Sequence, residues 1–250
     1  MWLFQKQIWT ENRYSDFYEE CVSLGIEIEQ TNIIPFTNHL SPEPSREPTL
    51  FFGSVRFYNI AKNRNWKTLP NPGVEIFKQA PELFFNGDGW ESTFGNVDFR
   101  GESEVFVKPY RDKFFTGTVI PNQQFLLEKV QTGSSSDPEK ELVWVSPAVN
   151  ILKEVRCYVI GGEVIAGSFY KCRGNVQQSE APDYILSEAK TILKELVSKI
   201  NFDEISFSLD IGIDSSGKWK IVELNNLNSA GIYHCNFGAL ARAYYNYYGK

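Results

Sequence analysis

The sequence holds few of the residues on which much metal and redox chemistry depends. Its 250 residues include two histidines, His39 and His234, and four scattered cysteines that form no C-x-x-C pair. Zinc sites and thiol redox centres need clustered cysteine or histidine ligands. We therefore expect neither kind of site, and no catalysis that relies on histidine.

Long apolar stretches are also absent. No segment approaches the 18 consecutive apolar residues of a membrane-spanning helix, and no apolar run follows a basic segment at the start. These absences predict a cytoplasmic protein that has no membrane partner and keeps its thiols reduced.

Positive charge is not in excess. The 25 lysines and arginines are outnumbered by 31 acidic residues, which gives a formal net charge of −6. A predominantly acidic surface disfavours a nucleic acid as partner, although it leaves room for a local basic pocket. Hydrophobic residues, at 42%, suffice for a sizeable core in one large domain or two small ones.

Residues 1–95 are expected to form a small α/β domain. Helical spacing of apolar residues predicts helices, and short apolar runs between turn residues predict strands. The expected helices cover residues 14–24 and 55–62, the expected strands cover 2–9, 26–34 and 49–54, and a proline-rich loop covers 41–48. We place the domain boundary within the segment 81–101, which is rich in Gly, Asn and Asp.

Residues 96–250 are expected to form the second domain. Alternating apolar residues predict strands over 104–110, 124–130, 141–145, 149–160, 163–172, 206–213 and 219–225. Amphipathic patterns predict helices over 183–200 and 236–248.

The last two of these strands form the most informative segment. If Asp214 pairs with Trp219 across the turn, then Asp210 lies directly across from Glu223. Directly opposed like charges are destabilising, so two carboxylates on an otherwise apolar hairpin predict a bound divalent cation. Asn225 shares a face with Glu223 and adds a neutral oxygen, which suits magnesium.

The same hairpin has two other interpretations. Asp210 and Glu223 are ordinary solvated carboxylates if this sheet face is exposed. Residues 212–218 also match the start of a phosphate-binding P-loop, G-x-x-x-x-G-K. That motif needs Ser or Thr next and then a helix, whereas Trp219 and a strand follow, so we interpret residues 214–218 as a turn.

Fixed cations precede the acidic hairpin. Lys108 ends a predicted strand and is followed by a loop with hydroxyls and a glycine, which suits a polyanion; a solvated lysine is the alternative. Arg156 is expected on a central sheet face, where its anionic partner is either Glu154 or a phosphate. Lys171 and Arg173 add positive charge nearby.

Taken in order, these segments resemble the ATP-grasp superfamily of carboxylate–amine ligases. The resemblance covers roughly residues 96–250 and rests on Val105–Pro109, Glu154–Ile160, Ser208–Asp210, Ile221–Asn225 and Gly231–Tyr233. It implies an α+β fold in which two α+β lobes grip ATP, preceded by the small α/β domain of residues 1–95.

The resemblance implies a role for each matching residue. Lys108 would contact the α and β phosphates, with Thr116 and Gly117 in the loop that closes over them. Arg156, with Lys171 or Arg173, would neutralise the γ-phosphate and the developing acyl phosphate. The backbone that contacts adenine would come from Val143, Trp144, Val145 and Ser146, and magnesium would bind Asp210, Glu223 and Asn225.

Two positions depart from the family pattern. Many members carry another phosphate-contacting lysine shortly before Lys108, but no lysine lies between Lys78 and Lys108 here. Arg100 or Lys78 is the candidate replacement. The usual acidic residue beside the adenine-contacting strand is also missing unless Glu141 serves.

The activity implied by the resemblance is ATP- and magnesium-dependent ligation. A substrate carboxylate attacks the γ-phosphate to give an acyl phosphate and ADP, and an amine then displaces phosphate to form an amide. The partners would be a small molecule or peptide with a carboxylate and an amine acceptor. A non-catalytic nucleotide-binding protein and a small-molecule kinase are the alternatives, and the sequence leaves the substrates and the oligomeric state open.

Overall fold

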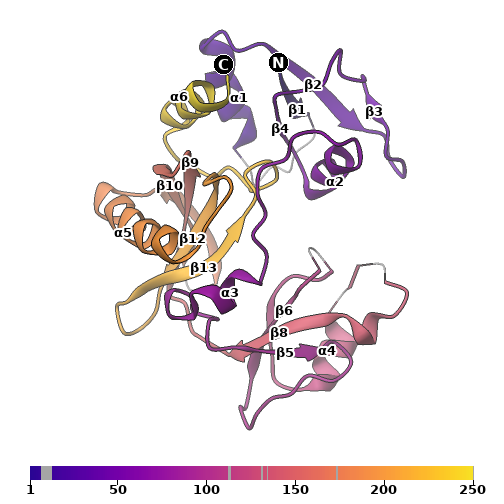
Figure 1. The fold of residues 1–250 in the computed structure, drawn as a ribbon, viewed down its shortest axis with the longest axis vertical. Helices are drawn as coiled ribbons and strands as arrows, with labels where there is room; N and C mark the ends of the chain where they lie inside the picture. Colours follow the sequence, from indigo (N-terminus) through magenta and orange to yellow (C-terminus); the bar gives the residue numbers. More distant parts are fainter. Residues whose placement is uncertain (7–12, 112–113, 131, 134, 173, 250) are drawn as a thin grey trace.

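Three β-sheets and their flanking helices make up the computed structural model, which describes residues 1–6, 13–111, 114–130, 132–133, 135–172 and 174–249. Each sheet belongs to a separate part of the molecule (Figure 1). We call these parts the N-terminal unit (residues 1–63), the small lobe (residues 90–147) and the large lobe (residues 153–225).

The N-terminal unit is a four-stranded sheet in the order β3-β2-β1-β4, with β1 parallel to both of its neighbours. Its elements are β1 (Trp2–Gln5), α1 (Tyr14–Ser23), β2 (Ile28–Ile33), β3 (Leu40–Ser41), β4 (Leu50–Phe52) and α2 (Val55–Asn63). These confirm the predicted α/β character. The predicted first strand ends earlier, at Gln5, and its residues 7–9 lie outside the described residues.

The small lobe is an antiparallel sheet in the order β5-β8-β6-β7. Its elements are β5 (Trp90–Thr93), β6 (Val105–Pro109), β7 (Thr118–Ile120), α4 (Gln123–Lys129), η2 (Pro138–Lys140) and β8 (Leu142–Pro147).

The predicted strand over 124–130 is wrong, because this segment forms α4. The Asn122 side chain accepts a hydrogen bond from the Phe125 backbone N–H at 2.8 Å and so caps a helix. Leu126 is the fully buried member of the apolar run. A short apolar run does not distinguish helix from strand, and the cap decides here.

The large lobe is a five-stranded sheet in the order β11-β10-β9-β12-β13. Its elements are β9 (Lys153–Ile160), β10 (Glu163–Cys172), β11 (Asn175–Glu180), α5 (Asp183–Lys199), β12 (Phe207–Ile213) and β13 (Trp219–Asn225). The short elements α3 (Ile76–Gln79) and η1 (Pro81–Leu83) precede the small lobe, and α6 (Phe237–Tyr248) follows the large one.

The two faces of the large sheet serve different purposes. Val155, Cys157 and Val159 of β9 alternate with Arg156 and Tyr158, which confirms the predicted alternation. The apolar face packs under α5, whose predicted stripe lies in the same core as the apolar residues of β12. The polar face is therefore the one that can carry a binding site.

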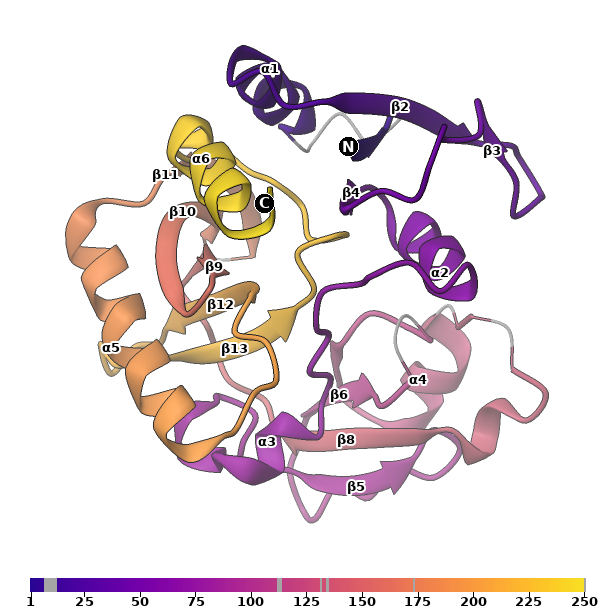
Figure 2. The same cartoon turned by 45° about the horizontal axis from the view of Figure 1, so that its top comes forward.

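The N-terminal unit covers one end of this polar face. Helices α1 and α6 lie side by side in both views (Figures 1 and 2), and Tyr158 joins the core that they share with β1 and β4. The predicted division at residues 95 and 96 stays a prediction. The small-lobe sheet spans it, since β5 lies before the division and pairs with β8 after it.

Asn228, in the segment between β13 and α6, ties these parts together. Its buried side chain accepts a hydrogen bond from the Leu69 N–H at 2.7 Å and donates one to the Phe51 carbonyl at 2.9 Å. Its own carbonyl accepts a hydrogen bond from the Gly53 N–H. One buried amide thus satisfies backbone groups of two other segments.

Replacing this amide should be costly. Asn228→Ala leaves a buried N–H and a buried C=O unpaired, at about 1–3 kcal/mol each. We expect the free energy of unfolding in urea to fall by about 3 kcal/mol. Ser229→Ala, at the partly exposed neighbour, is the control and should change it far less. Equal effects would contradict this role of Asn228.

Candidate nucleotide and metal site

The acidic hairpin has the predicted pairing of carboxylates. Asp210 of β12 lies directly across from Glu223 of β13, and Ser208 lies across from Asn225. The assumed starting pair is wrong, because Trp219 pairs with Ile213 rather than with Asp214. A β-bulge between Asp210 and Ile211 shifts the register by one residue and restores the predicted pairing of the carboxylates.

The intervening turn excludes a P-loop. Gly217 has a φ of +78° and is followed by β13 rather than a helix. This left-handed conformation is one that glycine adopts readily.

Arg156 and Asp210 form a buried, bidentate ion pair. Arg156 Nε lies 2.8 Å from Asp210 Oδ1, and Nη2 lies 2.6 Å from Oδ2. They are direct register partners on β9 and β12, and Asp210 has no exposed surface. Burial raises the pKa of Asp210, and the attraction of Arg156 opposes that rise. Arg156 therefore pairs with Asp210 rather than with Glu154, the side-chain partner predicted for it.

Lys108 joins the small lobe to the large lobe. Its Nζ lies 2.6 Å from Glu223 Oε2, and the two side chains are 21% and 30% exposed. Asn225 Nδ2 donates to the other oxygen, Oε1, at 2.9 Å. Burial raises the pKa of Glu223, but the attraction of Lys108 and these two hydrogen bonds outweigh it and lower the pKa well below 4.5.

A third ion pair lies next to these two. Lys171 Nζ lies 3.5 Å from Glu154 Oε2, and the Tyr170 hydroxyl donates to the same oxygen. That hydroxyl also lies 3.5 Å from Asp210 Oδ2. Arg173, the other predicted cation here, lies outside the described residues.

The polar face therefore balances its charges in pairs. Lys108, Arg156 and Lys171 face Glu223, Asp210 and Glu154 respectively. The three cations are those predicted to hold phosphates, and the first two carboxylates are those predicted to hold a metal. Each group satisfies the charge of its counterpart until a ligand supplies the opposite charge.

The predicted metal ligands suit a hard cation chemically. Asp210, Glu223 and Asn225 offer only oxygen ligands, as magnesium prefers. No group of three or more His, Cys, Asp or Glu side chains gathers closely enough to hold a metal within the described ranges. Two carboxylates and one amide are what this chain has, so the remaining ligands of a magnesium ion would be water or phosphate oxygens.

Thr116 and Gly117 lie beside Lys108, as the predicted loop requires. A Cβ on Gly117 would come within 2.7 Å of the Phe106 ring and 3.6 Å of Lys108 Cβ. Glycine is needed at this position because any side chain would collide with the strand that carries Lys108.

The predicted adenine-contacting strand, β8, is an interior strand. Val143, Trp144 and Val145 pair with β5 on one side and with β6 on the other. Their backbone groups thus face sheet partners, and only Ser146 and Pro147 extend beyond β5. The adenine contact stays a prediction, and Ser146 is its best-placed residue.

Asn86 is a residue that sequence reasoning missed. Its carbonyl accepts a hydrogen bond from Trp144 Nε1 at 2.7 Å, and its Oδ1 accepts one from Ser146 Oγ at 3.1 Å. One residue earlier, the Phe85 N–H donates to the Ile221 carbonyl of β13. The segment 84–86 therefore crosses between the lobes. Its only signal in the sequence is the turn-rich run Asn86–Gly89.

The candidate replacements for the missing lysine differ in position. Lys78 forms ion pairs with Glu75 and Glu91 and lies 5.9 Å from the Trp144 ring centre. Arg100 stacks on Trp90 with its guanidinium carbon 4.5 Å from the ring centre. Lys78 is therefore the one beside the predicted adenine strand.

Glu141 does not extend the site. Its carboxylate pairs with Arg111 at 2.8 Å and accepts a hydrogen bond from Ser135 at 2.6 Å. We assign it no adenine contact.

Tyrosines that sequence reasoning also missed surround Arg156. The rings of Tyr170 and Tyr233 are stacked 5.4 Å apart, and the Arg156 guanidinium carbon lies 5.2 Å from each ring centre. The Tyr158 hydroxyl donates to the Gly231 carbonyl at 3.1 Å and accepts from the Tyr233 N–H at 2.9 Å. The segment Gly231–Tyr233, which carries part of the resemblance, is thereby fixed beside Arg156.

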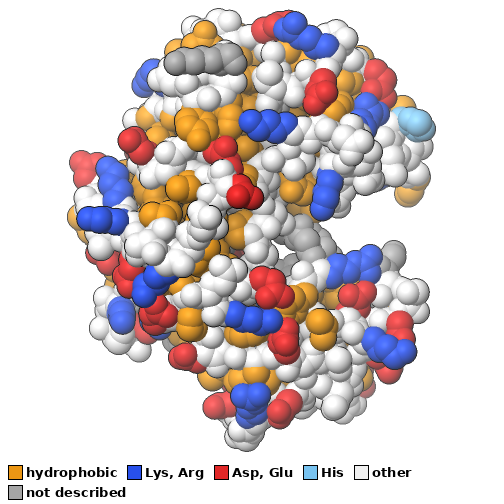
Figure 3. All heavy atoms as spheres, viewed as in Figure 1, with side chains coloured by type: hydrophobic (Ala, Val, Ile, Leu, Met, Phe, Trp, Pro, Cys, Tyr) orange, Lys and Arg blue, Asp and Glu red, His pale blue; other side chains and the backbone are white. Residues whose placement is uncertain are grey.

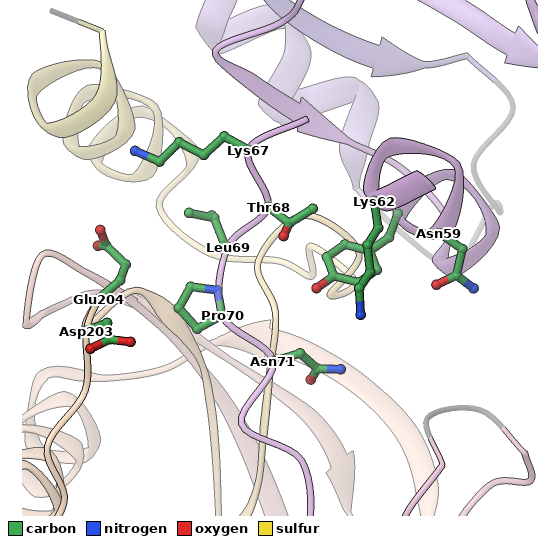
Figure 4. A pocket seen from close by; sticks show the side chains of 10 residues that line it. Asn59, Lys62, Lys67, Thr68, Leu69, Pro70, Asn71, Asp203 and Glu204 are labelled. Carbon is green, nitrogen blue, oxygen red and sulfur yellow. The ribbon is translucent and has the colours of Figure 1, made fainter. Parts of the chain in front are cut away.

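The surface is hollowed between the N-terminal unit and the small lobe (Figure 3). A separate pocket of about 570 Å³ lies between α2, the linker at residues 67–71 and Asp203–Glu204 (Figure 4). Lys62 and Lys67 line it, and it shares no residue with the predicted site. None of the helices in the described part of the chain has the length and apolarity of a membrane span.

Comparisons with known proteins identify the family. A family model described as an ATP-grasp domain, the second family of its clade, matches residues 84–243, more than half of the chain. The chain therefore belongs to the ATP-grasp superfamily. Within that superfamily it belongs to this second clade family. No curated protein matches it by sequence.

Solved structures share the fold at low sequence identity. D-cycloserine synthetase DcsG is 13% identical with a TM-score of 0.64, covering 97% of this chain and 96% of its own. D-alanine–D-alanine ligase from Bacillus anthracis is 9% identical with a TM-score of 0.57, covering 92% and 87%. The ATP-grasp ligase PsnB, complexed with a minimal precursor, is 11% identical with a TM-score of 0.50, covering 97% of each chain. The predicted α+β ATP-grasp fold is confirmed.

The Arg156–Asp210 pair should be essential to stability as a pair. Arg156→Ala leaves a buried carboxylate unpaired, and we expect the free energy of unfolding to fall by about 3–5 kcal/mol. The double variant Arg156→Leu with Asp210→Leu removes both charges and should be less destabilised than the sum of the two single variants. Urea unfolding measures all four proteins, and strictly additive losses would contradict the pairing.

The Lys108–Glu223 pair should give stability a characteristic pH dependence. Because folding lowers the pKa of Glu223 below 4.5, its ionised form stabilises the fold above that pH, and this contribution is lost as the pH falls further. Glu223→Gln should therefore lose less stability than wild type on acidification below pH 4.5. Thermal melts across this range check it, and parallel curves would contradict it.

Proposed function

We propose that this protein is an ATP- and magnesium-dependent ligase that joins a carboxylate to an amine through an acyl phosphate. Membership of the ATP-grasp superfamily supports the use of ATP. The finer statement depends on the residues of the polar sheet face.

The observation that carries the proposal is the ion pair between Lys108 and Glu223. These residues come from different lobes, and their charged atoms lie 2.6 Å apart. Arg156 and Asp210 lie on the same sheet face, on the two strands next inward from β13. A nucleotide bound between the lobes would meet cations from both and oxygen ligands from the large lobe.

The side chains of this chain suit charge neutralisation better than proton transfer. Lys108 would bind the phosphates, and Arg156 with Lys171 would neutralise the γ-phosphate as the substrate carboxylate attacks it. The amine then displaces phosphate from the acyl phosphate, and an amide forms. Such a reaction depends on positioning and charge stabilisation, so a site without histidine is no obstacle.

Magnesium would be held by Glu223, Asn225 and Asp210. The bound ion would neutralise phosphate charge and orient the phosphates. Asp210 is free to take part only when Arg156 turns from it to a phosphate, because both of its oxygens now accept bonds from Arg156.

The substrate class stays broad. One similar structure is a D-cycloserine synthetase, another is a D-alanine–D-alanine ligase, and a third was solved with a minimal precursor. We propose a small molecule or a peptide with a carboxylate, and an amine acceptor. Gly231–Tyr233 and the adjoining N-terminal unit would shape the acceptor site. We retain a cytoplasmic location without a nucleic acid or membrane partner as part of the proposal.

Calorimetry of ADP and ATP, with and without magnesium, tests the site. Wild type should bind both nucleotides in a magnesium-dependent manner. Lys108→Ala should weaken binding about tenfold or more, because it removes a charge-assisted contact with phosphate. The double variant Glu223→Ala with Asn225→Ala should abolish the magnesium dependence. Arg100→Ala is the control, since Arg100 lies on Trp90 away from the polar sheet face, and should bind like wild type.

Product analysis then tests the reaction. With ATP and candidate acids and amines, the proposal expects ADP, phosphate and an amide. A phosphorylated substrate would support a kinase instead. Absence of nucleotide binding by the wild type would refute the proposed site.

A further inference from the structure

Ser208 has an unexplained hydroxyl in the middle of the candidate site. The residue is fully buried, and its Oγ has no hydrogen-bond partner within the described part of the chain. It shares a face of β12 with Asp210, and it lies between Asn225 of β13 and Tyr158 of β9. A buried polar group without a partner destabilises a fold and therefore needs a reason.

The hydroxyl of Tyr158 does not serve as its partner. That hydroxyl donates to the Gly231 carbonyl and accepts from the Tyr233 N–H. Asn225 remains, and residues directly opposite on neighbouring strands have Cβ atoms about 5 Å apart. The Asn225 amide is thus the polar group best placed to reach Ser208.

In the present structure the Asn225 amide points its nitrogen at Glu223. Its Nδ2 donates to Glu223 Oε1 at 2.9 Å. A cation at Glu223 would repel this NH₂ group and attract the amide oxygen instead. When Oδ1 turns to the cation, the NH₂ group loses its acceptor and needs another.

We propose that Ser208 is a positioning residue, whose hydroxyl accepts a hydrogen bond from the Asn225 NH₂ group when magnesium binds and so holds Oδ1 toward the metal. The inference rests on the proposed function, since it assumes that Glu223 and Asn225 bind magnesium. It explains why a buried hydroxyl without a partner lies directly across from the amide ligand. The residue touches neither nucleotide nor metal and acts only through Asn225.

Titration of magnesium at saturating ADP, followed by melting temperature, tests the inference. Loss of the partner of a metal ligand typically weakens metal affinity by about 10–100-fold. Ser208→Ala should therefore need about tenfold more magnesium than wild type for the same stabilisation. Without ligand its melting temperature should equal or exceed that of wild type, because the variant removes an unpaired buried hydroxyl.

Three further variants separate positioning from a general structural effect. Ser206→Ala removes a buried hydroxyl on the same segment that does have partners, Glu204 at 2.6 Å and the Gly161 N–H at 3.0 Å. It should lower the ligand-free melting temperature and leave the magnesium requirement unchanged. Ser208→Thr keeps the hydroxyl and should restore the magnesium requirement of wild type. In the Asn225→Ala background, Ser208→Ala should have no further effect on it.

The outcomes distinguish this inference from the proposed function. If wild type shows magnesium-dependent stabilisation by ADP and Ser208→Ala matches it, the inference fails and the proposed function stands. If Ser208→Ala weakens magnesium binding equally with and without the Asn225 side chain, positioning through Asn225 is refuted. If wild type shows no magnesium-dependent stabilisation, both are overturned.

Discussion

Two carboxylates face each other on neighbouring strands, and each is neutralised by a cation from a different strand. Asp210 is held by Arg156 within the large sheet, and Glu223 is held by Lys108 from the small lobe. Neither carboxylate is stable in this partly buried setting without its partner. The relative placement of the two lobes at the site thus depends on charge pairing as well as on the apolar core around Trp144 and Phe77.

This arrangement links binding to the lobes themselves. A polyanion competes with Glu223 for Lys108, and a divalent cation competes with Lys108 for Glu223. Metal and nucleotide together replace both partners, whereas either alone leaves one buried charge without its partner. The physical expectation is a positive coupling between the two ligands, and such coupling acts reciprocally.

Much of this site follows from sequence because its signals are local. Alternation along β9 and β12 places Arg156 and Asp210 on one face, and the summed positions across the turn place Asp210 opposite Glu223. The β-bulge beyond Asp210 has no signal in the sequence, and its shift offsets the wrong starting pair.

Long-range contacts were out of reach of such signals. Neither the Lys108–Glu223 pair nor the stacking of Tyr170 on Tyr233 follows from spacing, because each joins segments far apart in the chain. The segment 124–130 shows a different failure. Its apolar run suggested a strand, although the Asn122 cap makes it a helix.

A crystal structure with a non-hydrolysable ATP analogue and magnesium tests the central claim most directly. The account predicts that the Lys108–Glu223 contact is broken, with Lys108 on a phosphate and with Glu223 and Asn225 on the metal. A nucleotide bound elsewhere, such as in the pocket at Lys62 and Lys67, with the Lys108–Glu223 pair intact, would contradict it.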